Sequence, residues 1–114
     1  MDATEAAPYR AALETERARL HEEIGEAIQA PDQMTYGSQA AAASQVFEQQ
    51  RDLALRDRAT QQLELVDAAL ERLDVGSFGT CLRCGKPIAD ARLEALPWAA
   101  HCIDCQSEID KGRR

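Results

Sequence analysis

The feature that most constrains this chain is its four cysteines, which form two Cys-x-x-Cys pairs with seventeen residues between them. Two residues between cysteines allow one tight turn to direct both sulfurs to the same point, and zinc binds four such sulfurs at about 2.3 Å in a tetrahedron. The gap between the pairs is typical of four-cysteine zinc sites. Gly85 permits a sharp backbone path in which amide groups face the thiolates. The expected ligands of one zinc ion are Cys81, Cys84, Cys102 and Cys105.

Two other uses of four cysteines stay open at this point. Two disulfides would suit a small exported domain, and an iron–sulfur cluster would use the same thiolates. The N-terminal segment MDATEAAPYR has no basic start followed by an apolar run, so no signal peptide is expected, and no apolar run approaches the length of a membrane span. We therefore expect a cytoplasmic protein, whose reduced thiols favour a metal. With four protein ligands the zinc is expected to be structural.

Upstream of the cysteines, the sequence predicts two amphipathic helices joined by a break. The first is expected over residues 7–28, and the second from about residue 39 or 44 to residue 74. Pro31 prevents a helix from continuing through the break, and a Gly-Ser pair at residues 37–38 supplies a flexible joint. Two such helices favour an antiparallel hairpin. The facing stripes would be Leu13, Leu20, Ile24 and Ile28 in the first helix and Leu63, Val66, Leu70 and Leu73 in the second.

The composition suits a coiled coil better than a thick core. Hydrophobic residues make up 45% of the chain, but aromatic residues make up only 4%, and a coiled coil needs only a narrow apolar seam. The expected fold is mainly α, with an antiparallel coiled-coil helical hairpin over residues 1–75 whose tip lies at about 30–43. A small C-terminal four-cysteine zinc finger would follow over residues 76–114, with a helical turn at 90–96 and a short terminal helix at 103–109. Because the break favours a hairpin within one chain, a monomer is expected.

The charge of the chain is concentrated in its first part. The net charge is −7, and residues 1–80 carry 7 basic and 15 acidic side chains, which gives −8. An acidic hairpin is poorly suited to nucleic-acid phosphates, because that binding depends on lysine and arginine. It suits a basic protein surface, or a channel that normally takes up nucleic acid. Specific DNA binding is therefore not expected. Enzyme activity is not expected either, because the sequence has no nucleophile–base constellation and no phosphate-binding glycine loop.

Three segments resemble the zinc finger of the DksA/TraR family. They are GSFGTCLRCGKPI at residues 76–88, ARLEALP at 91–97 and CIDC at 102–105. Residues 47–55, FEQQRDLAL, are similar to the second hairpin arm of its shorter, Bacillus-type branch. The resemblance implies a bacterial transcription regulator that binds RNA polymerase and inserts its hairpin into the secondary channel to modulate initiation. It also implies action together with the nucleotide ppGpp and no specific contact with DNA.

The resemblance further implies an Asp-x-Ala element at the hairpin tip, whose aspartate is important to activity. Counting back from Phe47, the matching residues here are 41–43, all alanine. Ala43 fits the pattern, but Ala41 stands where the aspartate is expected. The predicted partner-binding tip comprises Ala41, Ala43 and Ser44, although these alanines are also what a helix start would use. Since a methyl group carries no charge, the alternative function is a zinc-stabilised protein–protein adaptor that does not act on the polymerase active site.

Overall fold

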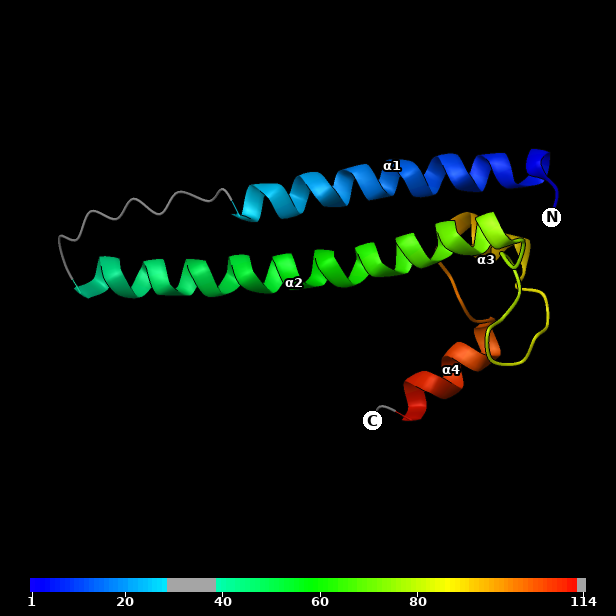
Figure 1. Ribbon diagram of the computed structural model, residues 1–114. Helices are drawn as coiled ribbons and strands as arrows, with labels where there is room; N and C mark the ends of the chain where they lie inside the picture. The colour runs from blue at the N-terminus through cyan, green and yellow to red at the C-terminus, as the bar shows by residue number, and fades with distance from the viewer. Residues whose placement is uncertain (29–38, 113–114) are drawn as a thin grey trace.

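The computed structural model describes the backbone of residues 1–28 and 39–112, and the side chains of that part except for residues 27, 28 and 39–42. Four helices are present in the described part: α1 (Ala3–Ile28), α2 (Gln39–Val75), α3 (Asp90–Ala95) and α4 (Ile103–Gly112). Figure 1 shows α1 and α2 lying side by side and antiparallel, with the N-terminus and the end of α2 at the same end as α3. The predicted mainly helical hairpin with a small C-terminal finger is confirmed. No helix in the described part is long and apolar enough to cross a membrane.

Helix α1 begins at Ala3, four residues before the predicted start. Asp2 is the reason: its Oδ1 accepts a hydrogen bond of 2.7 Å from the backbone N–H of Glu5, which is the geometry of an N-cap. The backbone N–H of Ala6 also reaches the carbonyl of Asp2, at 2.9 Å. Pro8 therefore lies inside the helix. The predicted start at residue 7 would place Pro8 in the first turn, and it does not take account of the capping residue Asp2.

Two ion pairs report the register of the hairpin. Arg10 Nη2 lies 2.8 Å from Asp74 Oδ1, and Arg17 Nη1 lies 3.9 Å from Asp67 Oδ1. All four side chains are well exposed, so these pairs add little stability. Arg10 and Arg17 are nevertheless two turns apart in α1, and their partners Asp74 and Asp67 are two turns apart in α2. The helices therefore keep one register over this length.

The seam between α1 and α2 is narrow and apolar. Leu13 and Val66 are fully buried, and Leu20 is 2% exposed. Small residues fill the rest of the α2 side, where Ala59 and Ala69 are also buried. Ile24, Leu63 and Leu73 pack against this core at its edges. The seam therefore uses the predicted stripes, except for Ile28, whose side chain lies outside the described part.

The finger packs against the open end of the hairpin. The ring of Phe78, just after α2, lies 5.3 Å from the ring of Tyr9 in α1. Burial, followed by the negative charges of Asp90 and Glu94, raises the pKa of Tyr9. The ring contact joins the start of α1 to the beginning of the finger.

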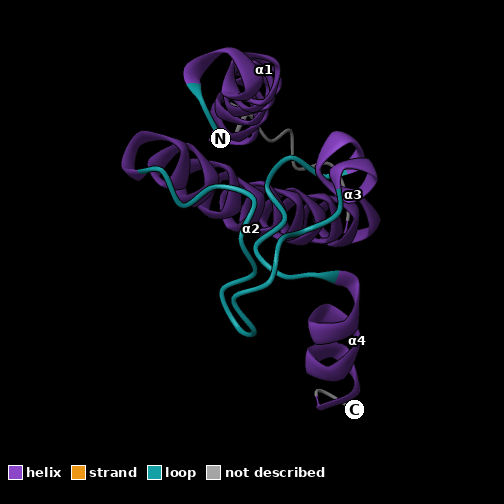
Figure 2. Cartoon of the chain, turned by 90° about the vertical axis from the view of Figure 1, so that its right-hand side faces the viewer, coloured by secondary structure: helices purple, strands orange, loops and turns teal. Residues whose placement is uncertain are grey.

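A second set of contacts extends the finger's attachment along α2. Arg72 Nη2 lies 3.5 Å from the carbonyl oxygen of Ala99, and burial lowers the pKa of Arg72. Trp98, half-buried, shares a cavity of about 460 Å³ with Leu20 of α1 and Ala59 of α2. Trp98 therefore lies between the finger and the hairpin. In Figure 2, α4 stands away from the hairpin, and it continues to Gly112, three residues past the predicted end.

We expect Leu13→Ala to destabilise the hairpin strongly. Leu13 is fully buried, and truncating a buried leucine costs about 2–5 kcal/mol because it removes apolar contacts and leaves a cavity. Leu53→Ala is the matched control, because Leu53 is 55% exposed and a change at such a position costs about 0.5 kcal/mol or less. Urea unfolding of the zinc-loaded proteins, followed by helical circular dichroism, measures both values. Equal losses would contradict the assignment of Leu13 to the seam.

Candidate metal centre

The first cysteine pair lies on a tight turn. The backbone N–H of Cys81 donates to the carbonyl of Lys86 at 2.9 Å, and that of Gly85 donates back to the carbonyl of Cys81 at 3.0 Å. Gly85 has φ +76°, a conformation that other residues adopt only at a cost of roughly 1–2 kcal/mol. An isolated antiparallel bridge between Thr80 and Pro87 closes the base of the turn. These bonds bring Cys81 and Cys84 onto one side of the turn.

The second pair lies where α4 begins. Cys102 directly precedes the helix and Cys105 is in its first turn, with the backbone N–H of Gln106 donating to the carbonyl of Cys102 at 2.9 Å. The backbone N–H of Leu82 donates to the carbonyl of Ala100 at 2.9 Å. That bond ties the turn of the first pair to the segment leading to the second.

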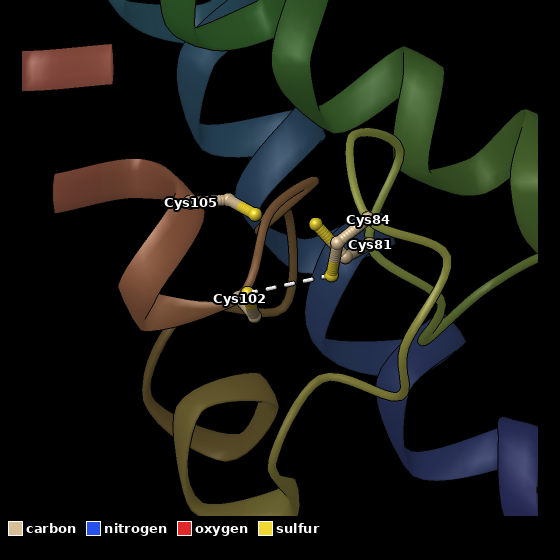
Figure 3. Close-up of side chains that lie close together, drawn as sticks. All are labelled: Cys81, Cys84, Cys102 and Cys105. Atoms are coloured by element: carbon tan, nitrogen blue, oxygen red, sulfur yellow. Dashed lines mark hydrogen bonds between the residues drawn. The ribbon is translucent and has the colours of Figure 1, made fainter. Parts of the chain in front are cut away.

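The four sulfurs converge on one point. Their Sγ atoms all lie within 4.8 Å of one another, and the Sγ atoms of Cys84 and Cys102 are 3.8 Å apart. A tetrahedron with zinc–sulfur bonds of about 2.3 Å has sulfur–sulfur edges of about 3.8 Å. Figure 3 shows the side chains of the two pairs pointing toward a shared space from opposite sides. All four thiols are free rather than joined in disulfides. The donor set and its spacing fit a tetrahedral zinc ion.

Crowding makes four thiolates unfavourable without a cation. Burial, together with the neighbouring sulfurs of Cys102, Cys81 and Cys84, raises the pKa of Cys105 to about 12. At Cys81 burial also acts to raise the pKa, but hydrogen bonds from the backbone of Cys84, Cys102 and Arg83 outweigh it and lower the pKa to about 5. The site therefore favours the thiolate of Cys81 and disfavours ionisation of Cys105. A divalent cation removes this repulsion, which is why thiolate sites bind zinc and release protons together.

His101, next to Cys102, is not among the clustered metal-binding side chains. It is half-buried, and its backbone carbonyl accepts a hydrogen bond of 3.0 Å from Arg92 Nε. The residues of the predicted tip lie apart from the cluster. At the far end of the hairpin, Ala43 and Ser44 are exposed in the first turns of α2. Ala41 lies in the same helix, but its side chain is outside the described part.

One charged contact of the centre was not predicted from the sequence. Arg83, which stands between Cys81 and Cys84, forms an ion pair with Glu108 of α4. The position of Arg83 inside the Cys-x-x-Cys segment was the sequence signal available for this contact. The partner could not be identified in advance, because pairing depends on how α4 is placed against the turn.

We expect Cys81→Ser or Cys102→Ser to abolish zinc binding and unfold residues 76–110. Most of the helical signal should persist, because α1 and α2 pack through their own seam. Metal analysis, circular dichroism and amide hydrogen exchange together measure the effect, with Ser107→Ala as a control at an exposed position of the same finger. Unchanged zinc content and unchanged exchange in the finger would contradict the ligand assignment.

Comparison with known proteins agrees with this geometry. The family described as "Prokaryotic dksA/traR C4-type zinc finger" matches residues 76–111. The chain is 41% identical over 68 residues to the RNA polymerase-binding transcription factor DksA of Haemophilus influenzae, covering 60% of this chain and 47% of that protein. It is 29% identical over 109 residues to the protein of the same name in Escherichia coli, covering 94% of this chain and 72% of that protein. The chain spans only about half of the length of several curated relatives that it matches, including DksA of Caulobacter vibrioides.

A solved structure extends the likeness to nearly the whole chain. Transcription factor DksA2 from Pseudomonas aeruginosa superposes with a TM-score of 0.77 and 32% identity, covering 99% of this chain and 88% of that one. The match to a four-cysteine finger and the convergent sulfurs together confirm the predicted structural zinc ion. The finger matches the family over residues 76–111, and a solved structure of a family member covers nearly the whole chain. The chain therefore belongs to the DksA/TraR family.

Proposed function

We propose that the chain is a regulator of bacterial transcription that binds RNA polymerase and inserts the far end of its hairpin into the secondary channel. The observation that carries the proposal is the family membership: relatives of this chain are RNA polymerase-binding transcription factors by name. In this proposal Cys81, Cys84, Cys102 and Cys105 hold the zinc, and the contact with the polymerase active site falls to Ala41, Ala43 and Ser44. The regulator has no catalytic role of its own.

The shape of the molecule supports insertion. The chain extends 60 Å along its longest axis and 20 Å along its shortest. Helix α2 has 37 residues against 26 in α1, and Figure 1 shows its first turns at the end of the rod opposite the finger. An elongated molecule with its finger at one end leaves the other end of the hairpin accessible for insertion.

The surface of α2 near that end supports protein contact. Val46, Phe47 and Leu53 are 52%, 69% and 55% exposed. Large apolar side chains that stay exposed together are typical of surfaces that another protein covers. The net charge of −8 over residues 1–80 makes nucleic acid a poor partner, so specific DNA binding is not part of the proposal. We propose that the chain acts as a monomer and in the cytoplasm, and that ppGpp acts jointly with it on the polymerase.

The alternative function rests on one residue. Ala41 stands where the family is expected to carry an acidic tip residue, and a methyl group neither accepts hydrogen bonds nor carries charge. A chain without tip chemistry could still use the apolar surface of α2 as a zinc-stabilised adaptor between proteins. The two functions differ in whether the polymerase active site responds.

Binding to core RNA polymerase is the first test. We expect the zinc-loaded chain to be retained by immobilised core polymerase at low salt and less well at moderate salt, since charged contacts are screened as ionic strength rises. Leu53→Asp should weaken retention, because it places a charge on the exposed apolar surface. Asp110→Asn, an exposed change in α4, is the control. No retention of the wild-type chain at either salt concentration would overturn the proposal.

Transcription with Ala41→Asp separates the two functions. The restored aspartate should lower the concentration needed for a half-maximal effect at a stable-RNA promoter by about tenfold or more, because a hydrogen bond to a charged group contributes about 1.5–3 kcal/mol. Ala54→Asp is the matched control, since it adds the same charge at an exposed position of α2 outside the predicted tip. If both the wild type and Ala41→Asp bind polymerase without changing transcription, the adaptor function is supported instead.

A further inference from the structure

Arg83 links the two halves of the metal centre. It belongs to the turn that carries the first cysteine pair, and its guanidinium Nη1 pairs with Oε2 of Glu108 on α4. The ion pair therefore runs from the first pair of ligands to the helix that carries the last one. No other ion pair in the described residues joins these two segments.

The ion pair lies on a face of α4 that also carries a ligand. Glu108 lies three residues after Cys105, and side chains three apart share one face of a helix. A guanidinium that pairs with Glu108 therefore lies along the face of α4 that carries Cys105. A guanidinium has five N–H donors, so it can donate to a carboxylate and to a second acceptor on the same face at once.

The negative charge of the metal centre determines how a cation beside a ligand affects the metal. Zinc with four thiolates carries a net charge of −2, and Asp104 and Glu108 on α4 add further negative charge nearby. A thiolate that accepts a hydrogen bond from a cation is less basic, so it is protonated and released less readily. Groups that hydrogen-bond metal ligands commonly change metal affinity by 10–100-fold.

We propose that Arg83 is a positioning residue of the zinc centre. It is held by Glu108 and donates to the Cys105 thiolate, and this contact slows the loss of zinc from the finger. The ion pair alone does not account for such an effect, because the side chains of Arg83 and Glu108 are 47% and 64% exposed and exposed pairs stabilise a fold little. The contact with the thiolate is the part that acts on the metal.

Transfer of zinc to a coloured chelator tests the proposal. Arg83→Gln should transfer its zinc about tenfold faster than wild type, the lower end of the range for groups that contact metal ligands. Lys86→Gln is the matched control, because it removes the same charge from an exposed residue of the same turn and should leave the rate near that of wild type. Arg83→Lys keeps the charge without the two-pronged guanidinium and should fall between them. Equal rates in Arg83→Gln and Lys86→Gln, fast or slow, would overturn the proposal.

The cobalt-substituted protein supplies a readout that a purely structural role would not change. Losing a hydrogen bond leaves a thiolate richer in electrons, so the sulfur-to-cobalt charge-transfer band should move to lower energy in Arg83→Gln. Glu108→Gln should produce a smaller shift in the same direction, since the arginine remains near Cys105 but is no longer held. An unshifted band in Arg83→Gln would show that the arginine does not contact the ligand sulfur.

Discussion

The convergence of four thiolates on one cation is the constraint on which the end of this molecule depends. The finger has no strands beyond a single bridge in the described residues, and its apolar core is small, with Phe78, Ile88 and Leu93 at its centre. A core of this size supplies little stability by itself. Zinc supplies the stability that the core lacks, because the free energy of metal binding also stabilises the folded finger.

The metal centre and the hairpin are joined by a few specific contacts rather than by a broad interface. Tyr9 packs on Phe78, and Arg72 reaches the carbonyl of Ala99. The finger is thereby fixed to both helices at the end where α1 begins and α2 ends. The far end of α2, with Ala43 and Ser44, is left free of the finger. In the proposed function, the end with the finger binds the metal and has a structural role, and the other end contacts the polymerase.

Much of this architecture follows from the sequence, because the signals are local. The spacing of the cysteines predicted the zinc site, and the stripes of Leu13, Leu20 and Val66 predicted the seam. The start of α1 was predicted too late, because Asp2 caps the helix four residues before the predicted start. The end of α4 was predicted too early, because the helix continues through Asp110 and Lys111 to Gly112. These errors lie at helix ends, where a single hydrogen bond decides the boundary.

Contacts between distant segments could not be predicted in the same way. The pairing of Arg83 with Glu108 depends on how α4 lies against the cysteine turn. No sequence pattern around either residue identifies the other as its partner. The tip remains a prediction: its importance rests on resemblance, and the side chain of Ala41 lies outside the described part.

Cleavage of the chain from within the polymerase tests the central claim most directly. Iron placed in the polymerase active site in place of magnesium produces hydroxyl radicals that cut only nearby backbone. Hairpin insertion predicts cuts close to residues 39–45 and intact backbone over residues 76–112. Cuts confined to the finger, or no cuts while the chain remains bound, would contradict the account.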